Sequence, residues 1–297
     1  MQHPLLVLLL PLALLLSSTL AWGTLGHRTV AYLASLYFTP ESTRFTNQLL
    51  HGQDISEAAL FPDKIRYIPS FAYTKAWHYI DAQDDPPARC GINITRDCAL
   101  ETGCVVSAIA NHTERVGDAG LPMWQRGQSL RFVLHFFGDV HQPLHTEAED
   151  RGGNEYAVVF DGRATNLHSV WDSLIVNRHA GMGHEDETLA AWTWAQRLAA
   201  GRDAEEDEDV CLRDAAECAL EWAGEANAHV CSYVLARDVH GQDLAGEYYD
   251  GAVPIIDDMV YKAGRRLAAW INAIVGDMDY PDLDLLDLEP LLRTQIN

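Results

Sequence analysis

The sequence predicts a mainly α-helical protein, built as a single helical-bundle domain with one small β-hairpin. Most segments after residue 21 carry apolar residues at the i, i+3, i+4 spacing of an amphipathic helix. Residues 155–167 show the pattern of a hairpin instead. The chain after residue 21 could form one large core or two modest domains, and the sequence has no linker, repeat or low-complexity tract, which favours one domain.

The chain begins with a leader of the secretory type. MQHPLLVLLLPLALLLSSTLA, residues 1–21, has no charged side chain, and its apolar run is shorter than the ~20 residues that a membrane-spanning helix needs. Thr19-Leu20-Ala21 fits the small-x-small rule, so we expect residues 1–21 to be a cleaved signal peptide. An uncleaved anchor is the alternative, because the segment lacks Lys and Arg. No later segment is apolar enough to span a bilayer.

The elements follow in order along the remaining chain. A first helix is expected from Thr24 to Phe38, and Thr39 and Pro40 then supply an N-cap and a first position for a second helix that reaches about Leu50. Further helical patterns cover residues 105–117, 127–142, 168–178, 186–200, 214–236 and 252–275. The hairpin should turn at Asp161-Gly162. From about residue 277 we expect an acidic, irregular tail packed along the body.

Cysteines and sequons indicate an extracellular protein. The sequence contains six cysteines, Cys90, Cys98, Cys104, Cys211, Cys218 and Cys231, all after the leader. An even number in a secreted chain predicts three disulfides, although about 15 pairings are possible. Asn93 and Asn111 each begin an N-x-T sequon, which predicts glycosylation. Leader, cysteines and sequons together predict secretion.

The net charge limits the classes of partner. The formal charge is −22 at pH 7, which repels polyanions and excludes tracking of duplex DNA through a basic groove. Chemistry on a phosphate would therefore need strong local positive charge. Bound metal ions are one source of it.

Two pairs of ionisable residues have the spacing of metal ligands. His135 and Asp139 are four residues apart, so on a helix they share one face and can bind one ion. Pro143 then breaks the helix and redirects His145. His168 and Asp172 repeat the H-x-x-x-D spacing.

Two stretches upstream, residues 61–66 and 77–81, each place ionisable side chains among apolar neighbours. Burying such a group is costly unless it is paired or bound to metal. Each single residue also has a plainer interpretation: His135 as a core histidine, Asp63 as a surface cap, Asp81 as solvated charge, and Trp77 and Trp171 as core residues. The joint pattern favours ligands, because cysteines in an oxidising compartment form disulfides and leave nitrogen and oxygen donors, which suit Zn²⁺. The candidates are His27, Asp63, His78, His135, Asp139, His145, His168 and Asp172, enough for two or three ions.

These residues stand in motifs that cover nearly the whole chain after the leader. The motifs are Trp22-Gly23 with His27, "PD-x-IR" at 62–66, "WHYID" at 77–81, "HFFGDVHQPLH" at 135–145, "GGN" at 152–154, "NLHSVWD" at 166–172, "LAGEYYDGAVPII" at 244–256 and "AGRRLAAWIN" at 263–272. In these motifs the chain resembles the zinc-dependent nucleases of fungi and plants of the P-one/S-one type, and more distantly bacterial zinc phospholipase C. The resemblance implies a helical fold with a trinuclear zinc cluster in a cleft.

The resemblance also implies the ligands of each zinc. One zinc is expected on Asp63, His78, His135 and Asp139; a second on Asp139, His27 and the amine and carbonyl of Trp22; and a third on His145, His168 and Asp172. Arg66 would balance charge on the phosphoryl oxygens, so Asp63, Arg66 and Asp139 are the expected catalytic residues. Tyr79, Asp81 and Asn154 match the base-binding region. For the disulfides the family pattern suggests Cys90–Cys231, to which short spacing adds Cys98–Cys104 and Cys211–Cys218.

The implied activity is cleavage of single-stranded RNA and DNA between phosphorus and the 3′ oxygen, giving 5′-mononucleotides, with 3′-nucleotidase activity. We expect a monomer that needs no protein partner and no membrane. Two alternatives stand beside this hypothesis. One is a phosphodiesterase that acts on phospholipid head groups, like zinc phospholipase C; the other is a non-catalytic secreted glycoprotein with structural zinc. The predicted third group supplies only three ligands, which is typical of catalytic sites.

Overall fold

The computed structural model of the chain describes residues 22–182, 186–202 and 210–277. The described part is mainly helical with one two-stranded antiparallel sheet, as the sequence predicts. Its elements are α1 (Thr24–Ser35), α2 (Pro40–Leu49), α3 (Ile55–Ala59), α4 (Phe61–Ile65), the 3₁₀ helix η1 (Pro69–His78), α5 (Ile94–Asp97), α6 (Val105–Gly117), α7 (Met123–Asp139), the 3₁₀ turn η2 (Pro143–Thr146), α8 (Asp150–Gly153), β1 (Ala157–Phe160), β2 (Arg163–Asn166), α9 (Leu167–Ser169), the π turn η3 (Val170–Leu174), α10 (Ile175–His179), α11 (Glu187–Ala200), α12 (Ala215–His229), the π turn η5 (Val230–Val234) and α13 (Glu247–Gly276). The predicted leader and most of the predicted tail lie outside the described residues.

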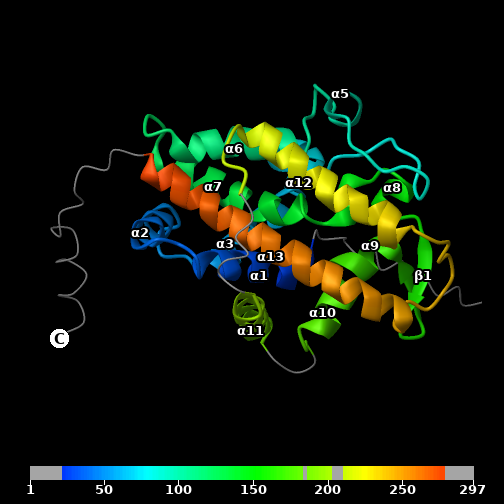
Figure 1. The fold of residues 1–297 in the computed structure, drawn as a ribbon. Helices are drawn as coiled ribbons and strands as arrows, with labels where there is room; N and C mark the ends of the chain where they lie inside the picture. The colour runs from blue at the N-terminus through cyan, green and yellow to red at the C-terminus, as the bar shows by residue number, and fades with distance from the viewer. Residues whose placement is uncertain (1–21, 183–185, 203–209, 278–297) are drawn as a thin grey trace, which may run out of the picture.

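Helix α1 lies in the centre of the bundle, against α3, α7, α11 and α13 (Figure 1). Its sequence is apolar around most of its circumference, and Leu25, Val30 and Leu33 are almost fully buried, as expected for a helix surrounded by others. Gly264 of α13 allows close packing there, because a Cβ on it would lie 2.7 Å from the Leu33 side chain. The central position of α1 fixes His27 in the interior.

The hairpin forms at one end of the bundle, near α8 and α9 (Figure 1). Its register pairs Ala157 with Asn166, and the turn falls at Asp161-Gly162, where both residues have positive φ. Glycine at the second position suits this left-handed backbone. Asp243 accepts hydrogen bonds from the backbone N–H groups of both turn residues. The turn predicted from the sequence is therefore confirmed.

Helix boundaries differ from the prediction at several places. The first helix ends at Ser35, short of Phe38, because Thr39 precedes a proline and takes an extended conformation. The helix predicted over 127–142 spans 123–139, and the one predicted over 252–275 begins at Glu247 with Pro254 inside it. The patterns over 168–178 and 214–236 each include a π turn. The short helices α3, α4 and α5 were not predicted, since they offer too few residues for a helical period, and η1 was not predicted because a 3₁₀ helix lacks the 3.6-residue period.

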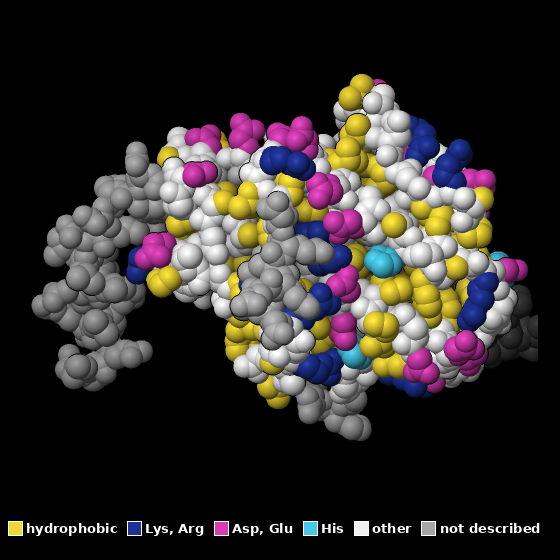
Figure 2. All heavy atoms as spheres, viewed as in Figure 1, with side chains coloured by type: hydrophobic (Ala, Val, Ile, Leu, Met, Phe, Trp, Pro, Cys, Tyr) yellow, Lys and Arg dark blue, Asp and Glu magenta, His cyan; other side chains and the backbone are white. Residues whose placement is uncertain are grey.

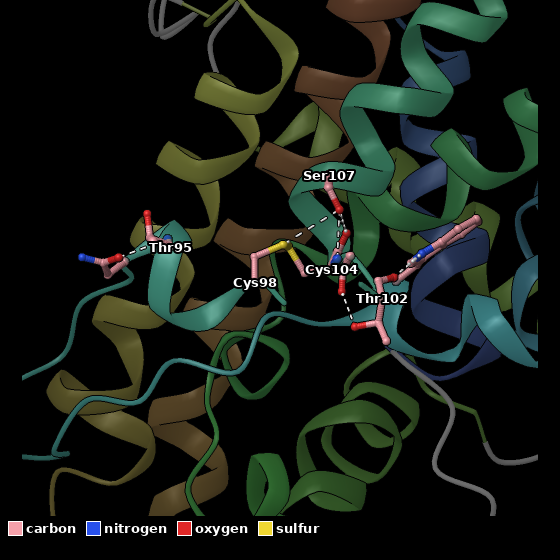
Figure 3. Close-up of a disulfide and its surroundings, with 8 residues drawn as sticks. Thr95, Cys98, Thr102, Cys104 and Ser107 are labelled. Atoms are coloured by element: carbon pink, nitrogen blue, oxygen red, sulfur yellow. Dashed lines mark hydrogen bonds between the residues drawn. A yellow bond between two sulfur atoms is a disulfide. The ribbon is translucent and has the colours of Figure 1, made fainter. Parts of the chain in front are cut away.

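The described cysteines form three disulfides, Cys90–Cys231, Cys98–Cys104 and Cys211–Cys218, which are the expected pairs. Figure 3 shows the second of them at the start of α6, beside the Ser107 hydroxyl. Ser107 also accepts from the Cys104 backbone N–H and so caps this helix. Cys90–Cys231 links the loop after η1 to the π turn η5 across a separation of 141 residues.

Removing this long-range disulfide should destabilise the protein strongly. In the chain-entropy account, a cross-link with this separation contributes about 5 kcal/mol and one with the separation of Cys98–Cys104 about 2 kcal/mol. We therefore expect the Cys90→Ala/Cys231→Ala double variant to lose clearly more unfolding free energy than Cys98→Ala/Cys104→Ala. Chemical denaturation followed by circular dichroism measures both losses. Equal losses would show that loop length does not govern the stabilisation.

The surface exposes both predicted glycosylation sites and carries charges of both signs. Asn93 and Asn111 are both exposed, which leaves their predicted glycosylation sterically open. On the face drawn in Figure 2, acidic side chains are interspersed with Lys and Arg, so that face carries both signs of charge. Among the described residues, no helix is both long and apolar enough for a membrane span.

Candidate metal centre

Eight His and Asp side chains converge in the interior, from elements far apart in the sequence. They are His27 of α1, Asp63 of α4, His78 at the end of η1, His135 and Asp139 of α7, His145 of η2, His168 of α9 and Asp172 of η3. Every one is buried. Their ligand atoms form three groups that could each hold a metal ion: His27 with His135 and Asp139, Asp63 with His78 and His135, and His145 with His168 and Asp172.

The Asp139 carboxylate lies at the centre of the first two groups. Its Oδ2 is 3.0 Å from His78 Nδ1 and 3.3 Å from His135 Nε2, and its Oδ1 is 3.4 Å from His27 Nε2. Asp63 Oδ1 is 3.8 Å from the same nitrogens of His78 and His135. One oxygen of Asp139 thus faces the Asp63 group and the other faces His27, so this carboxylate could contact ions in both places.

Trp22 and His27 both lie against α7. Trp22 is fully buried, and its backbone neighbour Gly23 donates to the Asp172 carbonyl at 2.7 Å. Gly138 makes room for both residues, because a Cβ there would lie 2.7 Å from His27 Nδ1 and 3.7 Å from Trp22 Cδ1. Residue 22 is therefore fixed beside the cluster, next to α7, which carries Asp139, and η3, which carries Asp172.

The third group forms where α9 passes into the π turn η3. His168 Nε2 lies 2.9 Å from Asp172 Oδ2, and His145 Nε2 lies 3.6 Å from Asp172 Oδ1. Gln142, just before the η2 turn, donates from Nε2 to Asp172 Oδ1 at 2.5 Å. His145 Nδ1 is also 3.4 Å from Asp139 Oδ1. This group therefore adjoins the other two.

Backbone carbonyls orient three of the imidazoles. The Nδ1–H of His135 donates to the Ala59 carbonyl at 2.8 Å, that of His145 to the His78 carbonyl at 3.0 Å, and that of His168 to the Gly152 carbonyl at 2.6 Å. Such bonds orient each ring so that its Nε2 faces the cluster, as is usual for histidines that bind metal. These rings are thus prepared as metal ligands.

The carbonyl that orients His168 comes from an unusual turn. Asp150, Arg151, Gly152 and Gly153 all have positive φ. At Gly152 a Cβ would lie 2.6 Å from the Leu144 carbonyl, so only glycine fits. Left-handed backbone of this kind is costly and is found where a site requires it.

Charges within the cluster set the pKa values. Burial acts to raise the pKa of Asp139, but the surrounding histidines, with His135 first, hold it well below the usual range. For Asp172 burial is again outweighed by His168 and His145, and its pKa falls to about 2. Burial acts to lower the pKa of His145, but its contacts with the two carboxylates raise it to about 10. Both carboxylates are therefore ionised at neutral pH.

The donor set fits metal ions. Among the described residues, several buried atoms of the cluster have no hydrogen-bond partner: both ring nitrogens of His27, both carboxylate oxygens of Asp63, Nε2 of His78, Oδ1 of Asp139 and Oδ2 of Asp172. Buried polar atoms are costly without a partner. Nitrogen and carboxylate donors without thiolates suit zinc, and the cluster would satisfy these atoms by coordinating it.

Among the remaining predicted site residues, Arg66 contacts the cluster. Arg66 Nη2 is 3.4 Å from Asp63 Oδ1, and its side chain is 12% exposed. Tyr79 and Asp81 follow His78 and are exposed, whereas Asn154 follows the left-handed turn and donates to the Arg151 carbonyl. Burial raises the pKa of Asp81. The described structure gives no contact between Asn154 and the other two, so their common base pocket stays a prediction.

Comparison with known proteins agrees with this centre. The sequence profile of the S1/P1 nuclease family matches residues 22–276. The chain belongs to the S1/P1 nuclease family.

Relatives in the S1/P1 family include fungal and plant proteins. The chain is 36% identical over 274 residues to Nuclease S1 of Aspergillus oryzae, covering 87% of this chain and 93% of the relative. It is 37% identical over 267 residues to Nuclease P1 of Penicillium citrinum, covering 86% and 98%. It is also 30% identical over 281 residues to Endonuclease 4 of Arabidopsis thaliana, covering 89% and 93%.

Sequence reasoning on this S1/P1 chain missed two residues that hold the cluster in place. Gln142 binds Asp172 and also accepts from the Leu144 backbone N–H; its position just before Pro143 was the available signal. Gly138 lies between His135 and Asp139, where a glycine within a helix pattern indicates close approach of another group. Trp171 is fully buried and Trp77 is partly buried against the core, as their plainer interpretation holds.

Proposed function

We propose that this chain is a zinc-dependent nuclease that cleaves single-stranded RNA and DNA at the P–O3′ bond, gives 5′-mononucleotides, and also acts as a 3′-nucleotidase. The observation that carries the proposal is the convergence of three His/Asp groups around Asp139 in a chain of the S1/P1 nuclease family. The nuclease names of the similar fungal proteins and the endonuclease names of the plant proteins support it.

Three zinc ions would be held by the three groups. Asp63, His78, His135 and Asp139 would hold the first, Asp139, His27 and the Trp22 amine and carbonyl the second, and His145, His168 and Asp172 the third. Zinc at such a centre supplies Lewis acidity toward phosphate and lowers the pKa of water. The chain's own contribution is to fix these donors rigidly, because backbone carbonyls orient three of the rings.

Arg66, Tyr79, Asp81 and Asn154 would act on the substrate. The Arg66 guanidinium beside Asp63 can donate to phosphoryl oxygens as negative charge builds on them. Tyr79 would offer a ring face to a base, Asp81 would accept from a base edge, and Asn154 would bound the same pocket from the opposite loop. A buried centre reaches a phosphate only where the strand can bend and turn out its base, which favours single strands.

The protein would act outside the cell as one nuclease domain, residues 22–297, after removal of residues 1–21. Three disulfides and exposed sequons are consistent with that location. The family match begins at Trp22, where cleavage would leave the new amine. We propose a monomer that needs no protein partner.

One assay separates this proposal from the two alternatives. The protein is incubated with single-stranded RNA, a 3′-mononucleotide or a phosphatidylcholine emulsion, each with and without EDTA. We expect turnover of the RNA and the mononucleotide that EDTA abolishes and zinc restores. Lipid cleavage without nucleotide release would support a phospholipase instead, and no turnover of any substrate would support a structural role for the metals.

Substitution of Arg66 tests its proposed role. We expect Arg66→Ala to lower kcat on single-stranded RNA by about 10²-fold, the usual effect of removing one donor that stabilises transition-state charge. Arg66→Lys should recover part of that loss, because it keeps the charge without the planar donor fork. Steady-state kinetics with metal analysis measures both variants. Equal loss in both, with reduced metal content, would show that Arg66 supports Asp63 structurally.

A further inference from the structure

Several exposed apolar rings and side chains follow one another next to the metal centre. Tyr67, Ile68 and Tyr73 are 55%, 46% and 59% exposed and lie on the segment that connects α4 with the end of η1, and Tyr79, 39% exposed, directly follows that segment. The two ends of this segment are Arg66 and His78, which both face Asp63. Exposed rings beside a site indicate a binding surface more than single scattered ones do.

Tyr67 is joined to the metal centre through Arg66. Arg66 Nη2 donates to the Tyr67 hydroxyl at 3.2 Å, and the guanidinium carbon lies 5.2 Å from the centroid of the Tyr67 ring. The same Nη2 is 3.4 Å from Asp63 Oδ1. One guanidinium therefore separates the Tyr67 ring from a carboxylate of the cluster.

Tyr79 is linked to the same carboxylate through its neighbour in the chain. It directly follows His78, whose Nδ1 is 3.8 Å from Asp63 Oδ1. The Arg66 charge also acts on the Tyr79 hydroxyl, although burial raises the pKa of that group overall. Tyr67 and Tyr79 thus each directly follow a residue whose side chain faces Asp63.

A phosphodiester carries a nucleoside on each side of its phosphorus, and a base stacks on an aromatic ring irrespective of its identity. The proposed function assigns Tyr79 to one of these bases. We propose that Tyr67 is a second stacking site, which binds the nucleobase on the other side of the scissile phosphate. This inference rests on the proposed function, because it needs a nucleic-acid substrate at the centre.

The Tyr67 hydroxyl could instead serve only to position Arg66. The two roles differ in what they require of the substrate, since stacking needs a base opposite Tyr67, whereas positioning of Arg66 through the hydroxyl and the ring acts on every substrate. Tyr67→Phe keeps the ring and removes the hydrogen bond to Arg66, whereas Tyr67→Ala removes both. Trp124→Ala is a matched control: Trp124 is 64% exposed near the start of α7, about 22 Å along that helix from Asp139 at 1.5 Å per residue.

The experiment compares three dinucleotides: one with both bases, one abasic on the 5′ side and one abasic on the 3′ side of the phosphate. For Tyr67→Ala we expect kcat/KM to fall about 5- to 150-fold on the dinucleotide with both bases and on one abasic substrate. The change should stay within about twofold on the abasic substrate that lacks the base opposite Tyr67. Tyr79→Ala should spare the other abasic substrate. Tyr67→Phe, which keeps the ring, should lose less than Tyr67→Ala on the dinucleotide with both bases, and Trp124→Ala should stay close to the wild type on all three.

Each contrary outcome identifies what fails. Equal losses of Tyr67→Ala on all three substrates would overturn stacking in favour of positioning of Arg66. If Tyr67→Ala shows no loss on any substrate, the inference is overturned as well. It is also overturned if Tyr67→Ala and Tyr79→Ala both spare the same abasic dinucleotide, because the two rings would then bind the same base. A wild-type protein that cleaves none of the three, and no single-stranded RNA, would overturn the proposed function itself.

Discussion

Asp139→Asn is expected to lower kcat on single-stranded RNA by about 10³-fold or more, since metal ions contribute several kcal/mol of transition-state stabilisation. It is also expected to reduce the metal content of the purified protein by more than one ion per chain. The reason is geometric: Asp139 Oδ2 faces His78 and His135, and its Oδ1 faces His27. An amide supplies one weak oxygen donor and cannot bridge two cations as a carboxylate does.

Asp257→Asn provides the matched control for this variant. Asp257 also pairs with a histidine, at 2.9 Å from His179, and accepts from the Trp194 indole N–H. None of these residues belongs to the three groups. We therefore expect Asp257→Asn to match the wild type in metal content, measured by mass spectrometry, and in the rate of RNA hydrolysis. An Asp139→Asn protein that keeps three zinc ions would contradict the bridging role.

A single residue added before Trp22 is expected to remove one zinc and lower activity by about 10²-fold or more, as the loss of one metal ion from a multi-metal site should do. The physical reason is the free α-amine, whose pKa near ~8 allows a metal to displace its proton. An amide nitrogen at the same position binds metal poorly. Trp22 is buried next to His27 and Gly138. The new terminal amine of the extended protein would lie one residue away from this place and could not take over the same contact.

The comparison needs two proteins that differ only at this end. One begins at Trp22 and the other retains Ala21 before it, and mass spectrometry confirms each terminus. We expect three zinc ions in the first protein and two in the second, with matching activities. Full zinc content and normal turnover in the extended protein would show that Trp22 is a core residue without a ligand role.

The sequence predicted those parts of the site that depend on helical spacing. His135 and Asp139 share one face of α7 because a helix places residues four apart on adjacent turns. His168 and Asp172 also meet, although the π turn η3 carries the second of them. Pro143 ends the helical pattern and lets His145 reach both Asp139 and Asp172. Convergence with His27 and Asp63 came from the family resemblance, since spacing alone cannot bring distant segments together.

Other features could not be read from the sequence, for physical reasons. The left-handed turn at Asp150–Gly153 includes two residues other than glycine, Asp150 and Arg151, and residues of these types rarely adopt the positive φ that they have here. The helices α3, α4 and α5 are too brief for a period to appear, and η1 is a 3₁₀ helix without the 3.6-residue period. Tyr67 gave no signal either, because only the structure shows that its ring is exposed and bound to Arg66.

X-ray anomalous scattering at the zinc absorption edge, from crystals of the protein that begins at Trp22, tests the central claim most directly. We predict three anomalous peaks: one among Asp63, His78, His135 and Asp139; one between Asp139, His27 and Trp22; and one among His145, His168 and Asp172. Fewer than three peaks, or a peak away from these groups, would contradict the three-zinc centre on which the proposed nuclease activity depends.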